Sequence, residues 1–319
     1  MHAQKFSFIS AVVNRAAVNA KYSYHFAATD SSQKTIQFSC DNLPSWLFLD
    51  TNNNTLSGIA KNPGQYAIQI TASNGDTNLH QNFMLTVFNK KTVNILPLGN
   101  SLTNGTNVYN SYRRDLWQLL HKGNYNFDFI GSWDKHHMGG NVPDADFDMD
   151  HDGHSGWKAS DLLNQPDWDK QRGNIRDWLL TYTPDIALLE FGTNEVFQCI
   201  INTDAINNID TVIQLLREKN KSVKIFLAQI PPLGAAWADK KLCNNDIEYA
   251  NAVIEFNKAI LQYGKAKNTT ASPIIIVDQF TGVNPALDMY DDIHPNSVGE
   301  KKMAKKWFAA MKKYLRKLN

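Results

Sequence analysis

The chain has 319 residues, of which 43% are hydrophobic and 20% are charged, and its formal net charge is +1. A chain of this length can bury a sizeable core and has room for two domains. The near-neutral charge gives no reason to expect a nucleic-acid partner, and no apolar run reaches the roughly 20 residues of a transmembrane helix. We therefore expect a globular protein whose partner is a small or neutral molecule.

The cysteines and the N-terminal sequence say little about cellular location. Cys40, Cys199 and Cys243 lie far apart, so their spacing indicates neither a zinc site nor a redox motif, and at least one is unpaired within the chain. The sequence MHAQKFSFISAVVNRAAVNAK has no uninterrupted apolar stretch of about 7–15 residues and is not a secretory signal. We expect a cytosolic protein, or one whose signal was removed before residue 1.

Residues 1–90 have the pattern of an all-β domain. The segments KYSYHFAA, KTIQFSC, GQYAIQITAS and QNFMLTVF are rich in aromatic and β-branched residues, and turn sequences such as DSS, KNPG and SNGD separate them. This spacing predicts a β-sandwich.

Residues 93–319 have the pattern of an α/β domain. The apolar strands VNILPLG, DIALLEFG, VKIFLAQI and PIIIVDQF alternate with helical stretches. Nearly continuous apolar strands of this kind predict a parallel sheet with helices on both faces, a three-layer flavodoxin-like arrangement. Functional residues of such sheets lie beyond the carboxyl ends of the strands.

The last predicted helix begins at about residue 297. Its apolar residues recur at spacings of three and four, and lysines and arginines fill most other positions. We expect an amphipathic helix docked through Met303, Trp307, Met311, Leu315 and Leu318, with a solvated basic face. The alternative is a helix that binds an anionic membrane surface.

Three short motifs at strand ends contain the groups that ester hydrolysis requires. Ser101 follows the strand VNILPLG and is either a helix cap or a nucleophile, although GNSLT lacks the second glycine of the G-x-S-x-G elbow. His294 follows Asp291 by three residues, and a carboxylate at this spacing can orient an imidazole that accepts a hydroxyl proton. Asn194, in FGTNE, is either a cap or an amide donor to an oxyanion.

The turn behind His294 predicts how the last helix begins. Ser297 and Glu300 have the spacing of a capping box, which would start the helix directly after the histidine and fix its position.

The motifs GNSLTNG, HDGHSGWKASDLL, FGTNE and DDIHPN resemble, in order, the four blocks of the SGNH (GDSL-type) hydrolases. The chain is also similar to carbohydrate acetylesterases of the acetylxylan esterase type. The stretches that carry this similarity are ILPLGNSLTNG, Tyr112-Arg113, FDFIGS, HDGHSGW and PDIALLEFGTNE. The resemblance implies a nucleophile, a general base and its orienting acid: Ser101, His294 and Asp291. It also implies three oxyanion donors: the backbone N–H groups of Ser101 and Gly156, and Asn194.

The chain departs from the family pattern at two positions. Asn100 stands where an aspartate is usual, and Glu195 stands where the third block also has an aspartate. We expect these changes to affect rate and fine geometry more than mechanism, because neither residue has a direct catalytic role in the family. Asp292 is a lesser candidate for the acid, since the family has a small residue there.

The stretch LPSWLFLDTNNNTLSGIAKNPGQYAIQITASNG resembles the cadherin-like immunoglobulin domains of bacterial surface and secreted proteins. The resemblance implies that Trp46 is a core residue, and that this domain binds glycan or packs on the catalytic domain. It favours a secreted, periplasmic or cell-surface location over a cytoplasmic one.

Ser155 is the rival nucleophile, but no strand directly precedes it. Asp148, Asp150 and Asp152 match the start of an EF-hand loop, yet Ala159 stands where that loop needs a glutamate, so only a weak calcium site is indicated. We expect no cofactor.

Further features bear on substrate binding. Trp133, Trp157 and Trp237 are partial core residues or sugar-stacking surfaces. Residues 231–245 form a loop long enough to shape the substrate site.

The expected function is hydrolysis of O-acetyl esters on a carbohydrate by a serine esterase. Two alternatives stay open. One is a lipid, lysophospholipid or general short-chain esterase on the same scaffold. The other is a glycan- or surface-binding protein whose hydrolase domain is inactive.

Overall fold

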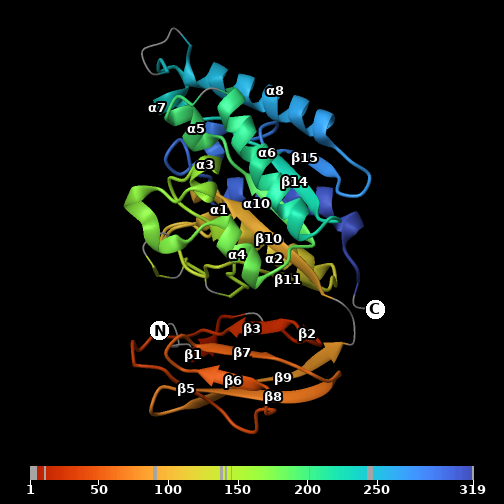
Figure 1. Ribbon diagram of the computed structural model, residues 1–319. Helices are drawn as coiled ribbons and strands as arrows, with labels where there is room; N and C mark the ends of the chain where they lie inside the picture. Colours follow the sequence, from red (N-terminus) through yellow and green to blue (C-terminus); the bar gives the residue numbers. More distant parts are fainter. Residues whose placement is uncertain are drawn as a thin grey trace.

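A computed structural model describes residues 6–10, 12–88, 92–136, 139–140, 142–144, 146–200, 202–242 and 247–317. Figure 1 shows an all-β part, in red and orange, stacked against an α/β part that runs from yellow to blue. An immunoglobulin-like β region followed by an α/β domain with a parallel sheet was predicted from the sequence, and the structure confirms both.

The all-β part is a sandwich of short strands. One sheet has the order β2-β9-β8-β5, a second has the order β3-β7-β6, and β1 pairs with β4. In β8, the buried residues Ile68, Ile70 and Ala72 alternate with more exposed ones, as expected for a strand with one face in the core. The strands are β1 (Phe6–Phe8), β2 (Arg15–Ala17), β3 (Lys21–His25), β4 (Ala28–Asp30), β5 (Gln37–Cys40), β6 (Leu47–Asp50), β7 (Thr55–Ile59), β8 (Gly64–Ser73) and β9 (Asn78–Phe88).

The α/β part is built on a parallel sheet with the order β11-β10-β13-β14-β15. The short strand β12 pairs with the end of β10, where Gly153 lies opposite Gly99, and Glu190 of β13 lies opposite Gly99 on the other side. Three chain segments thus reach the same sheet edge. The strands are β10 (Val93–Gly99), β11 (Phe127–Phe129), β12 (Asp152–Gly153), β13 (Ile186–Glu190), β14 (Lys224–Gln229) and β15 (Ile274–Asp278).

Helices cover both faces of this sheet. Helices α2 and α10 pack together on one face, and α3, α4, α6 and α8 share a core with the other face. None of the helices in the described ranges combines the length and apolar content that crossing a membrane needs. The helices are α1 (Ser101–Asn104), α2 (Tyr112–Lys122), α3 (Ala159–Leu163), η1 (Asp167–Arg172), α4 (Ile175–Thr181), α5 (Thr193–Phe197), α6 (Asn202–Lys219), α7 (Ala235–Ala238), α8 (Tyr249–Lys267), α9 (Pro285–Asp288), α10 (Ser297–Met311) and η2 (Lys312–Tyr314).

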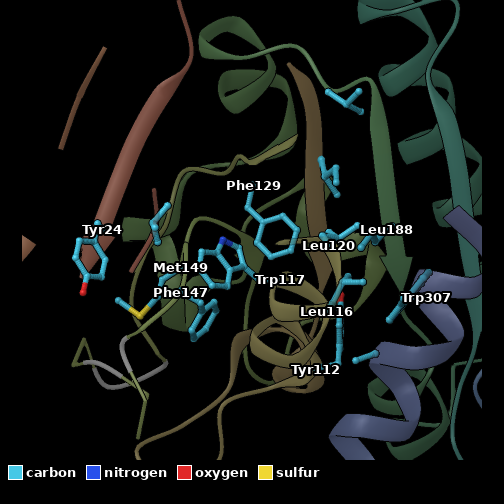
Figure 2. Packing of buried hydrophobic residues seen from close by; sticks show 14 of the residues in the cluster. Tyr24, Tyr112, Leu116, Trp117, Leu120, Phe129, Phe147, Met149, Leu188 and Trp307 are labelled. Carbon is cyan, nitrogen blue, oxygen red and sulfur yellow. The ribbon is translucent and has the colours of Figure 1, made fainter. Parts of the chain in front are cut away.

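The hydrophobic core on the α2 and α10 side continues into the β-sandwich. In Figure 2, Tyr24 of β3 and Trp307 of α10 lie at opposite ends of one cluster, with Trp117 and Phe129 between them. At the domain boundary, Lys21 Nζ lies 2.8 Å from Asp150 Oδ2. The N-terminal domain therefore packs on the α/β domain through both apolar and charged contacts.

Trp46 packs in the sandwich core, as its motif implied. Its ring makes edge contacts with Tyr22 and Tyr66, at centroid distances of 6.3 and 5.5 Å. Edge-to-face pairs of this kind add to the stability that burial alone provides.

Helix α10 docks through the predicted apolar residues Met303, Trp307 and Met311, which are buried, whereas Leu318 lies outside the described residues. The predicted capping box is wrong. The cap is Asn296, whose Oδ1 accepts from the N–H groups of Val298 and Gly299 at 2.9 and 3.3 Å. Glu300 instead turns to the α2 side and accepts from the Ser111 N–H at 2.5 Å. The Asn296 side chain satisfies two N–H groups of the first turn at once. Glu300 is therefore not needed as a cap and is free to bind the Ser111 N–H.

Candidate active site

Ser101 is the first residue of α1, directly beyond the carboxyl end of β10. The N-cap is the preceding residue, Asn100, whose Oδ1 accepts a hydrogen bond from the Leu102 N–H at 3.0 Å. Gly99 leaves no room for a side chain, because a Cβ there would lie 2.4 Å from Thr103 Oγ1. Because Asn100 caps α1, the Ser101 hydroxyl is not used for capping.

The hydroxyl of Ser101 meets a histidine from the other end of the sequence. Ser101 Oγ lies 2.9 Å from Nε2 of His294. Asp291 Oδ2 lies 2.8 Å from the other ring nitrogen, and Asp291 Oδ1 also accepts from the His294 backbone N–H at 2.8 Å. The structure thus brings together the three side chains predicted as nucleophile, base and orienting acid, in the order Ser101, His294 and Asp291.

The carboxylate of Asp291 is held in its ionised form. Partial burial raises its pKa, but the hydrogen bonds from the backbone and ring of His294 outweigh this effect, so the pKa is lowered overall. A carboxylate in this position keeps the Nδ1 proton of His294 in place and leaves Nε2 free to accept a proton from Ser101.

Asp292, the lesser candidate for the acid, has a different environment. Its backbone is in the left-handed region with φ of 65°, and its carbonyl accepts from the Gly234 N–H at 2.7 Å. A Cβ added to Gly234 would lie 1.8 Å from Asp292 Oδ1. Asp292 therefore packs against the start of the 231–245 loop, and it is Asp291 that contacts the imidazole.

Gly156 and Asn194 come from the two segments on either side of Ser101. Gly156 follows β12 and has a φ of +81°, a conformation that side chains other than glycine rarely adopt. Asn194 lies in α5, and its Nδ2 donates one hydrogen to the Trp157 carbonyl at 2.7 Å. An amide carries two N–H groups, so the second can serve a ligand.

Glu195 connects the segments that carry Gly156 and Asn194. Its Oε1 accepts from the Ala159 N–H at the start of α3 at 2.7 Å, and its Oε2 accepts from the Gly192 N–H at 2.9 Å. Burial raises the pKa of Glu195, although these backbone hydrogen bonds act in the opposite direction. The longer side chain at this position thus ties α3 to the start of α5.

Arg113, the buried arginine of α2, holds helix α1 in place. It donates to the carbonyls of Thr103, Met149 and Asn104 at 2.7, 2.7 and 3.0 Å. Burial lowers its pKa to about 10, so the guanidinium is still charged at neutral pH. Arg113 therefore connects the carbonyls of α1, the helix that begins with Ser101, to the segment that contains Met149.

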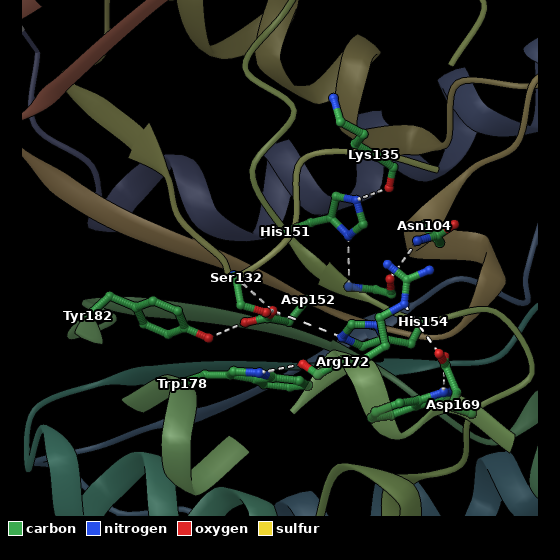
Figure 3. A network of polar contacts seen from close by, with 12 residues as sticks. Asn104, Ser132, Lys135, His151, Asp152, His154, Asp169, Arg172, Trp178 and Tyr182 are labelled. Atoms are coloured by element: carbon green, nitrogen blue, oxygen red, sulfur yellow. Dashed lines mark hydrogen bonds and ion pairs between the residues drawn. The ribbon is translucent and has the colours of Figure 1, made fainter. Parts of the chain in front are cut away.

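A polar network supports the loop that carries Gly156 (Figure 3). Asn104 Nδ2 donates to the Gly153 carbonyl at 2.7 Å, and Asp152 contacts Ser132 and Tyr182. His154 packs against the rings of Trp157 and Trp178, at centroid distances of 4.4 and 5.0 Å, and burial lowers its pKa to about 3. This histidine is therefore neutral at physiological pH.

Ser155, the rival nucleophile, has no histidine partner among the described residues. Its hydroxyl lies 3.4 Å from Asn104 Oδ1. Because a serine needs a nearby base to become a nucleophile, Ser155 is poorly placed for that role.

The aspartates of the EF-hand-like stretch are held by protein groups. Asp148 accepts from backbone N–H groups of residues 129 and 150, Asp150 pairs with Lys21, and Asp152 joins the network of Figure 3. Within the described residues, no group of three or more His, Cys, Asp or Glu side chains is arranged to hold a metal ion.

Two residues near the candidate site were not singled out in the sequence. The Tyr109 ring stacks on the His294 ring with a centroid distance of 5.2 Å and an interplanar angle of 27°. Glu190, at the end of β13, is fully buried, and neither of its oxygens has a hydrogen-bond partner among the described residues. Burial raises the pKa of Glu190 to about 8, so its carboxyl is neutral at pH 7. Tyr109 belongs to no motif, and Glu190 lies within PDIALLEFGTNE, but nothing in the sequence indicates the burial of Glu190 without a partner or the contact of Tyr109 with His294.

The three tryptophans considered as sugar-stacking surfaces are occupied. Trp157 is fully buried, the guanidinium of Arg172 lies 3.6 Å from the centre of the Trp133 ring, and Trp237 packs against Phe197 with a centroid distance of 5.0 Å. They contribute to packing.

A serine, histidine and aspartate in line, next to a glycine turn and a side-chain amide at the carboxyl edge of a parallel sheet, are the components of acyl transfer through an activated hydroxyl. The fold and the site thus define the class of serine ester hydrolases. The model of the GDSL-like lipase/acylhydrolase family matches residues 98–302, and the chain belongs to that family. Residues 7–88 match the family described as "Putative Ig domain".

Known relatives share the α/β part. A multidomain esterase from Ruminococcus flavefaciens is 31% identical over 235 residues, which are 70% of this chain and 29% of the relative's length. The solved structure of a carbohydrate esterase family 3 protein from Talaromyces cellulolyticus is 27% identical with a TM-score of 0.57, and an acetyl esterase variant crystallised with acetate is 26% identical with a TM-score of 0.56. Each structural match covers 70% of this chain and 98% of the other.

Proposed function

We propose that the chain is a serine esterase that removes O-acetyl groups from a carbohydrate. The observation that carries the proposal is the 2.9 Å contact between Ser101 Oγ and His294 Nε2, with Asp291 on the opposite ring nitrogen. A serine hydroxyl is a weak nucleophile until a neighbouring base takes its proton, and this geometry supplies such a base.

In the proposed reaction, His294 accepts the Ser101 proton as Oγ attacks the acetyl carbonyl. The N–H groups of Ser101 and Gly156 and the amide of Asn194 stabilise the oxyanion. The intermediate collapses when His294 gives its proton to the sugar oxygen, which leaves an acetyl ester on Ser101. Water then attacks this ester with His294 as base, and acetate is released. These steps require no cofactor.

Two observations support the substrate class. The similar solved proteins are described as an acetyl esterase and a carbohydrate esterase, and the curated relative is a multidomain esterase. The immunoglobulin-like match and the disulfide bond of Cys199 favour an oxidising compartment, so we infer a secreted, periplasmic or cell-surface location, where polysaccharide substrates are found.

The test is hydrolysis of p-nitrophenyl acetate, acetylated xylan and a lysophospholipid by the wild type and by Ser101→Ala, with Ser155→Ala as the matched control. We expect the wild type and Ser155→Ala to release acetate from xylan, and Ser101→Ala to lose at least about 1000-fold in kcat. Activity that survives in Ser101→Ala would place the nucleophile elsewhere. A preference for lysophospholipid would favour the lipid esterase, and a wild type inactive on all three would favour the binding protein.

A further inference from the structure

Trp168 differs from the other tryptophans of the chain. All eight lie within the described residues, and Trp168, with 60% of its surface accessible, is the only one that is largely exposed. It makes no ring stacking or cation contact with any described residue. A large aromatic ring left in water has most of its apolar surface available for a ligand.

The exposed indole lies at the candidate active site. A Cβ added to Gly156 would be 3.3 Å from Cη2 and 3.6 Å from Cζ2 of Trp168, so the edge of the six-membered ring of the indole lies beside this glycine. Gly156 is the turn residue whose N–H is a proposed oxyanion donor. The indole is therefore a neighbour of the position that the substrate carbonyl is proposed to occupy.

The backbone that carries Trp168 is anchored to the domain. In η1, Asp169 Oδ2 accepts from the Trp157 indole N–H at 3.0 Å, and the Arg172 carbonyl accepts from the Trp178 indole N–H at 2.8 Å. The Arg172 guanidinium is in turn seated on the Trp133 ring. Figure 3 shows Asp169, Arg172 and Trp178 within the network that supports the Gly156 loop. Little backbone freedom is therefore lost when a ligand stacks on Trp168.

We propose that Trp168 is a carbohydrate-binding platform, against which the C–H face of a substrate sugar ring stacks while its acetyl group reaches Ser101. The inference rests on the proposed function. Sugar rings present one face of C–H bonds and a rim of hydroxyls, and a rigid, exposed aromatic ring beside the catalytic centre is complementary to that face.

The kinetic test compares carbohydrate esters with an ester that has no ring. We would measure hydrolysis by four proteins: the wild type, Trp168→Ala, Trp168→Phe and Phe48→Ala. The substrates are acetylated xylo-oligosaccharides, peracetylated glucose, ethyl acetate and ethyl butyrate. Phe48→Ala is the matched control, because Phe48 is equally exposed, at 65%, but lies in the N-terminal domain. We expect Trp168→Ala to lose about 10-fold in kcat/KM on the carbohydrates, mainly through KM, and much less on ethyl acetate.

Trp168→Phe should restore most of the loss, and Phe48→Ala should match the wild type on every ester. An equal loss on ethyl acetate would overturn the proposal, because Trp168 would then act on the oxyanion turn. A gain on ethyl butyrate over ethyl acetate in Trp168→Ala would also overturn it, since the indole would then be a wall of the acyl site.

Calorimetric binding separates this inference from the proposed function. Acetylated xylo-oligosaccharides are titrated into Ser101→Ala and into Ser101→Ala combined with Trp168→Ala. We expect the Kd to be about 10-fold weaker in the double variant. If the Kd depends on Trp168 but the wild type hydrolyses no carbohydrate ester, Trp168 is a binding platform and the proposed function is wrong. If the Kd is the same in both variants and the wild type is active, the proposed function stands and the role proposed for Trp168 is wrong.

Discussion

Asn100 and Ser101 are adjacent but have separate tasks. The Asn100 side chain, which is fully buried, caps α1 through Leu102, and this leaves the Ser101 hydroxyl free to contact His294. An aspartate could make the same cap, but it would bury a charge, which costs free energy unless a partner compensates for it. The amide makes the cap without burying a charge, but its Nδ2 is buried with no hydrogen-bond partner among the described residues.

Glu190 is a buried residue whose protonation affects stability. Its pKa is raised from 4.5 to about 8, so between these values the folded protein holds a proton that the unfolded chain has lost. A group of this kind stabilises the fold most at low pH, and its contribution is lost as pH rises through the folded pKa.

We predict that Glu190→Gln becomes more stable than the wild type as pH rises from 5 to 8, by about 1.4 kcal/mol per pH unit, with no further gain above pH 8. Urea unfolding at pH 5, 6.5, 8 and 9 measures the difference. Glu218→Gln, at an exposed position of α6, is the control and should follow the wild type at each pH. A constant difference between Glu190→Gln and the wild type would show that the carboxyl does not titrate in this range.

Motif residues could be predicted from sequence, but their supporting partners could not. Ser101, Asn194 and His294 follow strand ends in recognisable order, and the structure brings Ser101 and His294 into contact. Tyr109 and Trp168 lie in segments without periodicity, and their relation to His294 and Gly156 depends on which side chains meet in three dimensions. Sequence spacing carries no information about such contacts.

At the scale of elements, two short helices depend on one carboxylate. Helices α3 and α5 each have five residues, too few to be stable without tertiary contacts. Glu195 binds backbone N–H groups at the start of both helices. In addition, the Trp157 carbonyl accepts a hydrogen bond from the Asn194 side chain. The mutual position of Gly156 and Asn194 therefore rests on this junction.

We predict that Glu195→Ala lowers the free energy of unfolding by about 2–4 kcal/mol, because two buried N–H groups lose their acceptor. It should also reduce kcat on p-nitrophenyl acetate by about 10-fold or more, since the oxyanion donors would no longer be held in register. Urea unfolding and initial rates on the same preparations provide both values.

Asp161→Ala is the matched control. Asp161 caps the same helix through the Lys158 N–H at 2.8 Å but does not reach α5. It should lose about 1 kcal/mol of stability and keep its kcat. If both variants lost kcat equally, the link between α3 and α5 would not be the cause.

Long elements were easier to predict than short ones. The apolar strands and the helices α6, α8 and α10 extend over enough residues for their periodicity to be visible, and their arrangement as a covered parallel sheet was predicted correctly. The helices between residues 159 and 181 were not predicted, because each is too short for a periodic pattern. The capping error at α10 arose because Asn296 and Ser297 are both good caps, and only the fold determines which one is used.

At the scale of the whole molecule, the domain boundary concentrates acidic groups. Burial raises the pKa of Asp148 to about 7 and also raises that of Asp150. Burial lowers the pKa of Lys21, but Asp150 more than offsets this, so the pKa of Lys21 is raised overall. The lysine of the N-terminal domain thus compensates for carboxylates of the α/β domain, and it does so more as they ionise.

We predict that Lys21→Met destabilises the protein by about 1 kcal/mol at pH 8 and by less at pH 5, where the carboxyl of Asp148 is largely protonated. A double-mutant cycle with Asp148→Asn, measured by urea unfolding at both pH values, gives the coupling energy between Lys21 and Asp148. Lys34→Met, which removes the exposed pair with Asp76 inside the N-terminal domain, should have a small effect that is the same at both pH values. Coupling that is equal at pH 5 and pH 8 would contradict the prediction.

The pairing of β12 with the end of β10 has a consequence for how this scaffold can change. Gly153 lies opposite Gly99, so Ser101 and the Gly156 turn extend from neighbouring strands of one parallel backbone ladder. Their spacing is set by main-chain hydrogen bonds and is independent of the length of the connection between β11 and β12. Insertions or deletions at the exposed Gly139 and Gly140 of that connection should therefore be tolerated in evolution and in engineering, whereas Phe147 and Met149 of the same connection are buried in the core.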